Sequence, residues 1–277
     1  MKKILPLFLL LAGLTGCQST TPLETWLTPE KQAGWQTKNI AVEDFVLRGY
    51  IMSQADHPVL RIYIEGDGHA WLRPTVQSPD PTPYHPLMLQ LAAEDIHKQV
   101  AYLARPCQYT MPTHPAQNCD KKYWGQARFA PEVIRAMNQA IDDLKQSTGA
   151  QKVALIGYSG GGGIAVLLAA RRDDVQNLRT IAGNLDHQAF TDYHQLSPMT
   201  QSLNPADVAA DVVDIPQIHF AGGKDEVVVP QIAEAYARAL PHMACTRLAS
   251  VPWATHTQGW VETWPRLVWQ KPACKND

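Results

Sequence analysis

One serine of this chain has neighbours that could make it a nucleophile. Gly157, Ser159 and Gly161 have the spacing G-x-S-x-G, which is typical of a serine held on a sharp turn between a strand and a helix. The apolar run 153–156 precedes the turn, and the apolar run 164–170 follows it with the length of a helix. Such a turn lifts the serine hydroxyl clear of the sheet, and small flanking residues let strand and helix approach. The spacing therefore predicts a nucleophile at position 159.

The same glycines permit two other interpretations. Gly160, Gly162 and Ala165 fit the dinucleotide-binding pattern G-x-G-x-x-A, and a glycine-rich turn can also contain a serine by chance. The dinucleotide pattern belongs to the first strand of its domain, whereas at least three strand-like segments precede these glycines here. Their position in the chain favours the nucleophile.

The first residues have the composition of a secretory signal. Two lysines precede an apolar run over 4–14, and the sequence Leu-Thr-Gly-Cys ends at Cys17. These four residues resemble the lipobox of bacterial lipoproteins, in which the cysteine receives a diacylglyceryl group and becomes the N-terminus. An ordinary signal peptide or a membrane anchor is the alternative, although the apolar run is too short to span a bilayer. We expect acylation of Cys17, the lipid bilayer as a partner, and a location in the bacterial cell envelope. Gln18 favours the outer membrane, facing the periplasm, if the host is Gram-negative.

Four cysteines besides the lipobox cysteine predict two disulfides. Their number is even, and the signal directs the chain to an oxidising compartment. Three connectivities are possible. We favour Cys107 with Cys119 and Cys245 with Cys274, because each of these pairs closes a local loop. No C-x-x-C pair is present, so we do not expect these cysteines to bind a metal.

Length and charge limit the classes of function. The chain has 277 residues and a formal net charge of −2, without a dense cluster of Lys and Arg, so nucleic acid is not an expected partner. It contains neither H-E-x-x-H nor a P-loop, and we therefore expect no cofactor and no metal. No sequence feature sets the oligomeric state.

Strand-like and helix-like segments alternate along the chain. We expect strands at 40–47, 49–53, 59–64, 100–104, 153–156, 178–182, 217–221 and 246–251, and helices at 86–98, 131–147, 164–170, 230–240 and 258–270. This alternation predicts an α/β fold with a mainly parallel, doubly wound sheet and antiparallel N-terminal strands. The expected organisation is a signal over 1–16, a tether over 17–37 and one domain over 38–277, with a possible small lid over 187–214.

This order of elements resembles the α/β-hydrolase superfamily over nearly all of the mature chain. In that superfamily a catalytic acid follows the seventh strand and a histidine follows the eighth. The resemblance implies that Asp225 is the acid, because a strand, a glycine turn, this Asp and Val-Pro follow one another. It likewise implies that His256, in the loop after the last strand, is the base.

Other residues compete for these two roles. His242 lies near the end of an expected helix, where a cation suits the helix C-terminus. Asp207, Asp211 and Asp214 are rivals for the acid that are more typical of solvated or capping residues. Glu226 is adjacent to the expected acid and would normally point elsewhere.

An oxyanion hole would need two backbone donors. The N–H of Gly160 at the start of the helix is the first, and the resemblance implies that the N–H of Asp67 is the second. The loop departs from the usual esterase pattern, because Glu65 and Asp67 place two carboxylates beside the expected oxyanion. Either they turn away and bond to loop backbone, or they recognise a basic or hydroxyl-bearing part of the substrate.

Three aromatic residues are candidates for a substrate pocket. Trp71, Tyr158 and Trp253 could line it, although aromatic side chains fill cores at least as often as pockets. The implied function is a membrane-anchored serine hydrolase, carboxylesterase-like or lipase-like, acting on a small-molecule or lipid ester. A peptidase or thioesterase on the same three residues is an alternative. A non-catalytic envelope lipoprotein that uses this scaffold for binding is a rival of another class.

Overall fold

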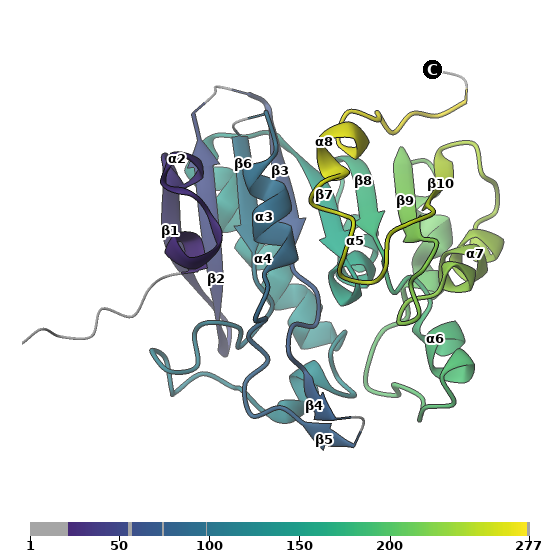
Figure 1. Ribbon diagram of the computed structural model, residues 1–277, viewed down its shortest axis with the longest axis horizontal. Helices are drawn as coiled ribbons and strands as arrows, with labels where there is room; N and C mark the ends of the chain where they lie inside the picture. Colours follow the sequence, from purple (N-terminus) through teal and green to yellow (C-terminus); the bar gives the residue numbers. More distant parts are fainter. Residues whose placement is uncertain (1–21, 55–56, 74, 98, 276–277) are drawn as a thin grey trace, which may run out of the picture.

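An eight-stranded sheet forms the centre of the molecule in the computed structural model, which describes residues 22–54, 57–73, 75–97 and 99–275. Its strands are β1 (Trp35–Val42), β2 (Phe45–Ser53), β3 (Val59–Ile64), β6 (Gln99–Leu103), β7 (Lys152–Tyr158), β8 (Val175–Ile181), β9 (Gln217–Gly222) and β10 (Thr246–Val251). Their order is β1-β2-β6-β3-β7-β8-β9-β10 (Figure 1). β2 pairs antiparallel with β1 and β6, and the other neighbours are parallel. A separate antiparallel pair consists of β4 (Trp71–Arg73) and β5 (Val76–Gln77).

Helices cover both faces of the sheet because its central strands are apolar on both sides. One face carries α4 (Pro131–Thr148), α5 (Gly160–Ala169), α7 (Pro230–Ala239) and the 3-10 helix η2 (Pro205–Val212); the other carries α1 (Pro22–Trp26), α3 (Leu87–Ala93) and α8 (Trp264–Leu267) (Figure 1). The shorter elements are α2 (Pro29–Gln32), α6 (His187–Tyr193) and the 3-10 helix η1 (Lys121–Trp124). Within the described ranges, no helix combines the length and the apolar composition needed to cross a membrane.

The strongest helical pattern of the sequence forms the longest helix. α4 begins with Pro131 in its first turn and ends at Gly149, whose φ of 70° closes the helix in the left-handed region. The apolar positions of its predicted face are buried in the core against the sheet: Val133, Ile134, Met137, Ile141 and Leu144. The prediction of a helix over 131–147 is confirmed.

Three expected elements have different boundaries in the structure. The first two strands meet at a turn over 43–44, with Glu43 at φ 48°, rather than before Gly49. The helix expected to reach residue 98 ends at Ala93, because Asp95 turns to pair with Arg61 and accepts the N–H of residue 97. The closing helix shrinks to α8, since Gly259 takes a φ of 87° in the preceding turns.

The segment expected to be a tether is partly folded. The prediction placed it over 17–37, but α1 and α2 lie within that range, and β1 begins two residues before its end. Leu23 and Leu27 are buried in the same apolar cluster as α3. The domain therefore begins earlier than expected, at or before α1. The expected signal (1–16) and Cys17 lie outside the described residues.

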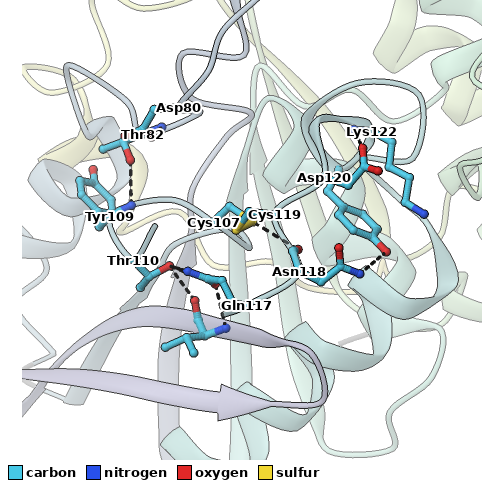
Figure 2. Close-up of a disulfide and its surroundings, with 12 residues drawn as sticks. Asp80, Thr82, Cys107, Tyr109, Thr110, Gln117, Asn118, Cys119, Asp120 and Lys122 are labelled. Carbon is cyan, nitrogen blue, oxygen red and sulfur yellow. Dashed lines mark hydrogen bonds between the residues drawn. A yellow bond between two sulfur atoms is a disulfide. The ribbon is translucent and has the colours of Figure 1, made fainter. Parts of the chain in front are cut away.

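Both disulfides have the local pairing that we favour. Cys107 bonds to Cys119, and Cys245 bonds to Cys274. Figure 2 shows the first bond and the loop that it closes, where Thr110 Oγ1 also accepts a hydrogen bond from Gln117 Nε2 over 3.0 Å. The chain continues from Cys119 into residues 120–128, which form one wall of the cleft described below.

Candidate active site

Ser159 lies on the sharp turn between β7 and α5. Its φ of 52° and ψ of −123° are a strained conformation for a residue with a side chain. Hydrogen bonds hold this backbone on both sides, since Ser159 N–H donates to Ile181 O at 3.0 Å and Ser159 O accepts Asn184 N–H at 2.9 Å. The turn thus presents the hydroxyl at the carboxyl end of the sheet.

The glycines on either side of this serine are required by close backbone contacts. A Cβ atom on Gly157 would lie 2.2 Å from Gly161 O, and a Cβ on Gly161 would lie 2.4 Å from Glu65 O. Neither neighbour is a flexible side chain that could move away. Both glycines therefore allow β7, α5 and the loop after β3 to meet at one point, as their spacing in the sequence predicts.

The structure brings Asp225 and His256 to this serine from the ends of two other strands. His256 Nε2 lies 3.1 Å from Ser159 Oγ, and His256 Nδ1 lies 2.9 Å from Asp225 Oδ2. The other carboxylate oxygen of Asp225 accepts the N–H groups of Val227 and Val228 at 2.9 and 2.8 Å. Asp225 is buried and cannot rotate without losing these bonds. A hydroxyl, an imidazole and a carboxylate thus form one hydrogen-bonded chain.

The backbone of His256 is also fixed in place. Its carbonyl accepts hydrogen bonds from Tyr158 Oη and Trp260 Nε1, each at 3.1 Å. Burial raises the pKa of Tyr158 well above its ordinary value, so this phenol remains a hydrogen-bond donor at neutral pH. Tyr158 lines the cleft as expected, and it also orients the imidazole.

The rival residues lie elsewhere or have other partners. His242 Nε2 lies 3.8 Å from Asp214 Oδ1 at the surface, and Asp207 and Asp211 are exposed around η2. Glu226 lines the cleft but is exposed. None of these five residues is hydrogen-bonded to Ser159. The imidazole of His256 is hydrogen-bonded to it.

The two positions expected to supply oxyanion donors lie on different elements beside the serine. Gly160 is the first residue of α5, where an N–H has no partner within the helix. Asp67 approaches the same point, because a Cβ added to Gly160 would lie 2.1 Å from Asp67 Oδ1. The two positions expected to supply oxyanion donors are therefore in contact.

The two carboxylates of this loop have different partners. Glu65 turns away and accepts the N–H of Gly66 at 2.9 Å and the hydroxyl of Tyr102 at 3.3 Å. Burial raises the pKa of Glu65 to about 7, although these hydrogen bonds lower it. Its environment matches the first of the two expected alternatives, in which the carboxylate bonds to loop backbone.

Asp67 follows neither alternative, because it forms salt bridges with two arginines. Asp67 Oδ1 accepts Arg105 Nη1 at 3.0 Å, and Asp67 Oδ2 accepts Arg128 Nη1 at 2.7 Å. Burial would raise the pKa of Asp67, but the charges and hydrogen bonds of Arg128 and Arg105 outweigh burial and lower it. Two cations around one carboxylate leave this group of three side chains with a net positive charge beside Gly160, in place of the unpaired carboxylate that the sequence suggests there.

A cleft of about 1150 Å³ opens over Ser159 and His256. Trp71 and Tyr158 line it as expected. Trp253 does not line the cleft: it is 54% exposed, and its Nε1 donates to Thr263 Oγ1 at 3.3 Å. The pocket role expected for Trp253 is wrong, because its loop turns the indole toward the end of the chain.

The segment expected to be a lid forms one side of this cleft. Phe190, Thr191 and His194 from α6 and the residue after it line the opening. His194 Nε2 lies 2.7 Å from Val227 O, in the loop that also positions the acid. The first half of 187–214 therefore contacts both the cleft and the loop after β9.

Sequence reasoning missed three residues of the site. Arg105 and Arg128 lie 38 and 61 positions from Asp67, and no motif marks them. Asn184 lines the cleft, and its buried Oδ1 has no hydrogen-bond partner among the described residues. For Asn184, the only signal in the sequence was a polar residue in the loop after β8, the strand next to β7. No group of three or more His, Cys, Asp or Glu side chains in the described part of the chain could hold a metal ion.

Comparison with solved structures identifies the architecture. Est1E from Butyrivibrio proteoclasticus has 14% identity and a TM-score of 0.57, with 84% of this chain and 95% of that one covered. Esterase Pf2001 of Pyrococcus furiosus has 13% identity and a TM-score of 0.61, with 88% and 93% covered. A putative dienelactone hydrolase from Klebsiella pneumoniae has 16% identity and a TM-score of 0.59, with 85% and 95% covered.

Sequence comparison adds no closer relationship. No protein-family model matches the chain, and no curated protein matches it. At identities of 13–16% the likeness to solved structures concerns the fold. The strand order, the two helical layers and these structures together show that the chain has the α/β-hydrolase fold.

Proposed function

We propose that this protein is a serine hydrolase that cleaves carboxylic esters through an acyl-enzyme intermediate. One observation carries the proposal: Ser159 Oγ, the imidazole of His256 and the carboxylate of Asp225 are joined by hydrogen bonds of 3.1 and 2.9 Å. A serine hydroxyl is a weak nucleophile at neutral pH and needs an adjacent base, which this arrangement supplies.

The reaction proceeds in two half-reactions. His256 Nε2 takes the proton from Ser159 as the oxygen attacks the ester carbonyl, and Asp225 holds the imidazole tautomer and stabilises the imidazolium. When the tetrahedral intermediate collapses, the C–O bond to the leaving alcohol breaks, and His256 returns the proton to that oxygen. Water then attacks the acyl-enzyme with the same base, and the acid is released.

The oxyanion is stabilised by backbone N–H groups and by charge. The N–H groups of Gly160 and Asp67 are the donors, and the partial positive charge of the N-terminus of α5 adds to them. Arg105 and Arg128 keep the Asp67 carboxylate paired, so the developing negative charge does not meet an unpaired anion. In our proposal Asp67 therefore acts through its amide, while its side chain positions the loop.

The substrate is a small-molecule or lipid ester in the bacterial envelope. Esterases and a putative dienelactone hydrolase are among the solved structures that share the fold, which supports an ester as the proposed substrate class. The signal and the lipobox over residues 1–17 support attachment to a membrane through Cys17. Gln18 supports the outer membrane if the host is Gram-negative.

A fluorophosphonate probe tests the proposal directly. We expect the purified protein to be labelled, because the probe reacts only with an activated serine. Ser159→Ala should abolish labelling and lower kcat on p-nitrophenyl acetate about 10⁴-fold or more. Ser197→Ala is the matched control, since Ser197 also lines the cleft and is exposed, and it should retain both labelling and turnover.

The same experiment separates a hydrolase from a binding module on the same scaffold. A folded wild-type protein that neither reacts with the probe nor hydrolyses the ester would contradict the proposal and favour the binding module.

A further inference from the structure

Four large apolar side chains are exposed at the mouth of the cleft. Trp71, Leu72 and Val76 belong to the β4–β5 pair and are 43%, 49% and 43% exposed, and Tyr84 in the following loop is 66% exposed. Trp71 and Tyr84 also line the cleft, whereas Leu72 and Val76 do not. Figure 1 shows the β4–β5 pair extending beyond the carboxyl ends of the strands. We call these four residues the apolar rim.

The apolar rim is built on an ordered base. Ser78 N–H donates to Ala70 O at 2.9 Å, next to the β4–β5 pair. Trp124 Nε1, which is buried, donates to Ser78 O at 3.0 Å, and the Tyr84 ring lies 4.2 Å from that of His69. The local structure therefore keeps these apolar side chains exposed to solvent. An exposed apolar patch of this kind is typical of a surface that binds a membrane or another molecule.

Basic residues surround the apolar rim. Arg73 lies between Leu72 and Val76, and Lys121 and Lys122 line the same side of the cleft; all three are exposed. Asp120 is the acidic neighbour, and its side chain accepts the N–H of Lys122. Apolar and aromatic side chains flanked by cations are the composition of surfaces that bind anionic lipid bilayers.

The N-terminal end of the domain contacts a residue that lines the cleft. The ring of Trp26 in α1 is 4.5 Å from that of His85, and His85 lines the cleft. Cys17 is five residues before Pro22, so it lies within about 18 Å of the start of α1 even with a fully extended chain. A domain of this length has a diameter of about 45 Å. An acyl chain on Cys17 would therefore keep the bilayer near the mouth of the cleft.

We propose that the apolar rim docks on the anionic bilayer to which the chain is anchored and turns the cleft toward esters at the membrane surface. The proposal rests on the proposed hydrolase function and on the expected acylation of Cys17. Trp71, Leu72, Val76 and Tyr84 enter the interface between headgroups and acyl chains, while the basic residues contact phosphate groups. The substrate class is then an ester of a lipid, or of a molecule held at the bilayer.

Vesicle binding by a form without the lipid anchor tests the docking. Residues 18–277 contain every described element and would be exported behind a non-lipoprotein signal so that both disulfides form. We expect this form to co-sediment with vesicles of phosphatidylethanolamine and phosphatidylglycerol. Leu72→Ser combined with Val76→Ser should weaken binding about tenfold or more, because less apolar surface leaves water.

A matched double variant controls for a general loss of surface hydrophobicity. Ile96 and Trp269 are 54% and 65% exposed. Ile96 lies shortly before the amino end of β6, and Trp269 is two residues after α8. Figure 1 shows α8 and the β4–β5 pair at opposite ends of the molecule. Ile96→Ser combined with Trp269→Ser should bind vesicles as the wild type does. Equal thermal unfolding midpoints would show that all three proteins are folded.

Several outcomes would overturn the docking proposal. These are absence of vesicle binding by the wild type, equal binding by the Leu72/Val76 variant, and a dimer in solution that this variant dissociates. The last result would identify a second copy of the chain as the partner. Hydrolysis of a soluble short-chain ester is measured separately and should be unchanged in the variant, because Leu72 and Val76 do not line the cleft. Failure of that hydrolysis in the wild type would contradict the proposed function, whatever the vesicles show.

Discussion

The loop beside Ser159 carries two carboxylates, and different neighbours control their charge. Asp67 is held ionised by two guanidinium groups, whereas Glu65 is buried beside Tyr102 without a cation, and its pKa is raised to about 7. A protonated Glu65 would add no negative charge near the oxyanion that the proposed reaction forms. At residue scale, the site therefore limits local negative charge by pairing one carboxylate and raising the pKa of the other.

Glu65 should make the stability of the protein depend on pH. Its pKa is raised from 4.5 in the unfolded chain to about 7 in the folded one, so its stabilising contribution is fully present below pH 4.5 and is lost as pH rises through about 7. We expect the free energy of unfolding of the wild type, relative to Glu65→Gln, to fall by about 3 kcal/mol between pH 4 and pH 8. Urea unfolding across this range measures the difference, and parallel curves for the two proteins would contradict the assignment.

The turn between β7 and α5 is the element on which the site depends. It joins a strand with six buried residues to a helix that is buried along its whole length, and the loop after β3 packs against it. The backbone of this turn is strained at Ser159, and the surrounding strands must compensate for that strain. Positioning of the hydroxyl is therefore coupled to stability.

Gly157→Ala should disrupt this element. The new Cβ would lie 2.2 Å from Gly161 O, so the backbone must shift, at a cost of about 2–4 kcal/mol in the free energy of unfolding. Fluorophosphonate labelling should fall with it. Gly49→Ala in β2 is the control, because its Cβ would lie 3.5 Å from Ile40 and Leu144, and its effect should be less than about 1 kcal/mol. Similar unfolding curves for the two variants would show that the turn tolerates a side chain.

At the scale of the whole molecule, two disulfides fasten peripheral loops to the sheet. Cys107–Cys119 closes the loop before the cleft wall at residues 120–128 (Figure 2). Cys245–Cys274 ties the end of the described chain to the residue before β10. Both lie outside the serine–imidazole–carboxylate chain, so their loss should affect stability more than the chemical step.

Replacing both Cys107 and Cys119 by Ser should lower the free energy of unfolding by about 3 kcal/mol, because a loop of this length loses that much chain entropy when it is closed in the unfolded state. The intact residues of the site should still react with the fluorophosphonate probe. Chemical unfolding under non-reducing conditions measures the change. Unchanged stability in the variant would show that packing of the loop, rather than the covalent bond, holds the cleft wall.

The sequence by itself determined the features that depend on neighbours along the chain. The G-x-S-x-G turn, the amphipathic α4 and the alternation of strands and helices follow from short-range geometry, and the predicted fold class is confirmed. The cysteines predicted two disulfides, and the favoured local pairing is the one that the structure contains. Ser159 was named from its motif, and Asp225 and His256 from the order of elements that resembles the α/β-hydrolase superfamily. Their assigned roles stay a prediction until the probe experiment.

Only the tertiary structure decided what surrounds these three residues. Arg105 and Arg128 reach Asp67 because the loops after β6 and before α4 converge on the loop after β3. Likewise Trp253 leaves the cleft, and the β4–β5 pair carries exposed apolar side chains to its mouth. Such contacts depend on how strands register and how loops cross at one edge of the sheet, and no period or motif in the sequence encodes those distances.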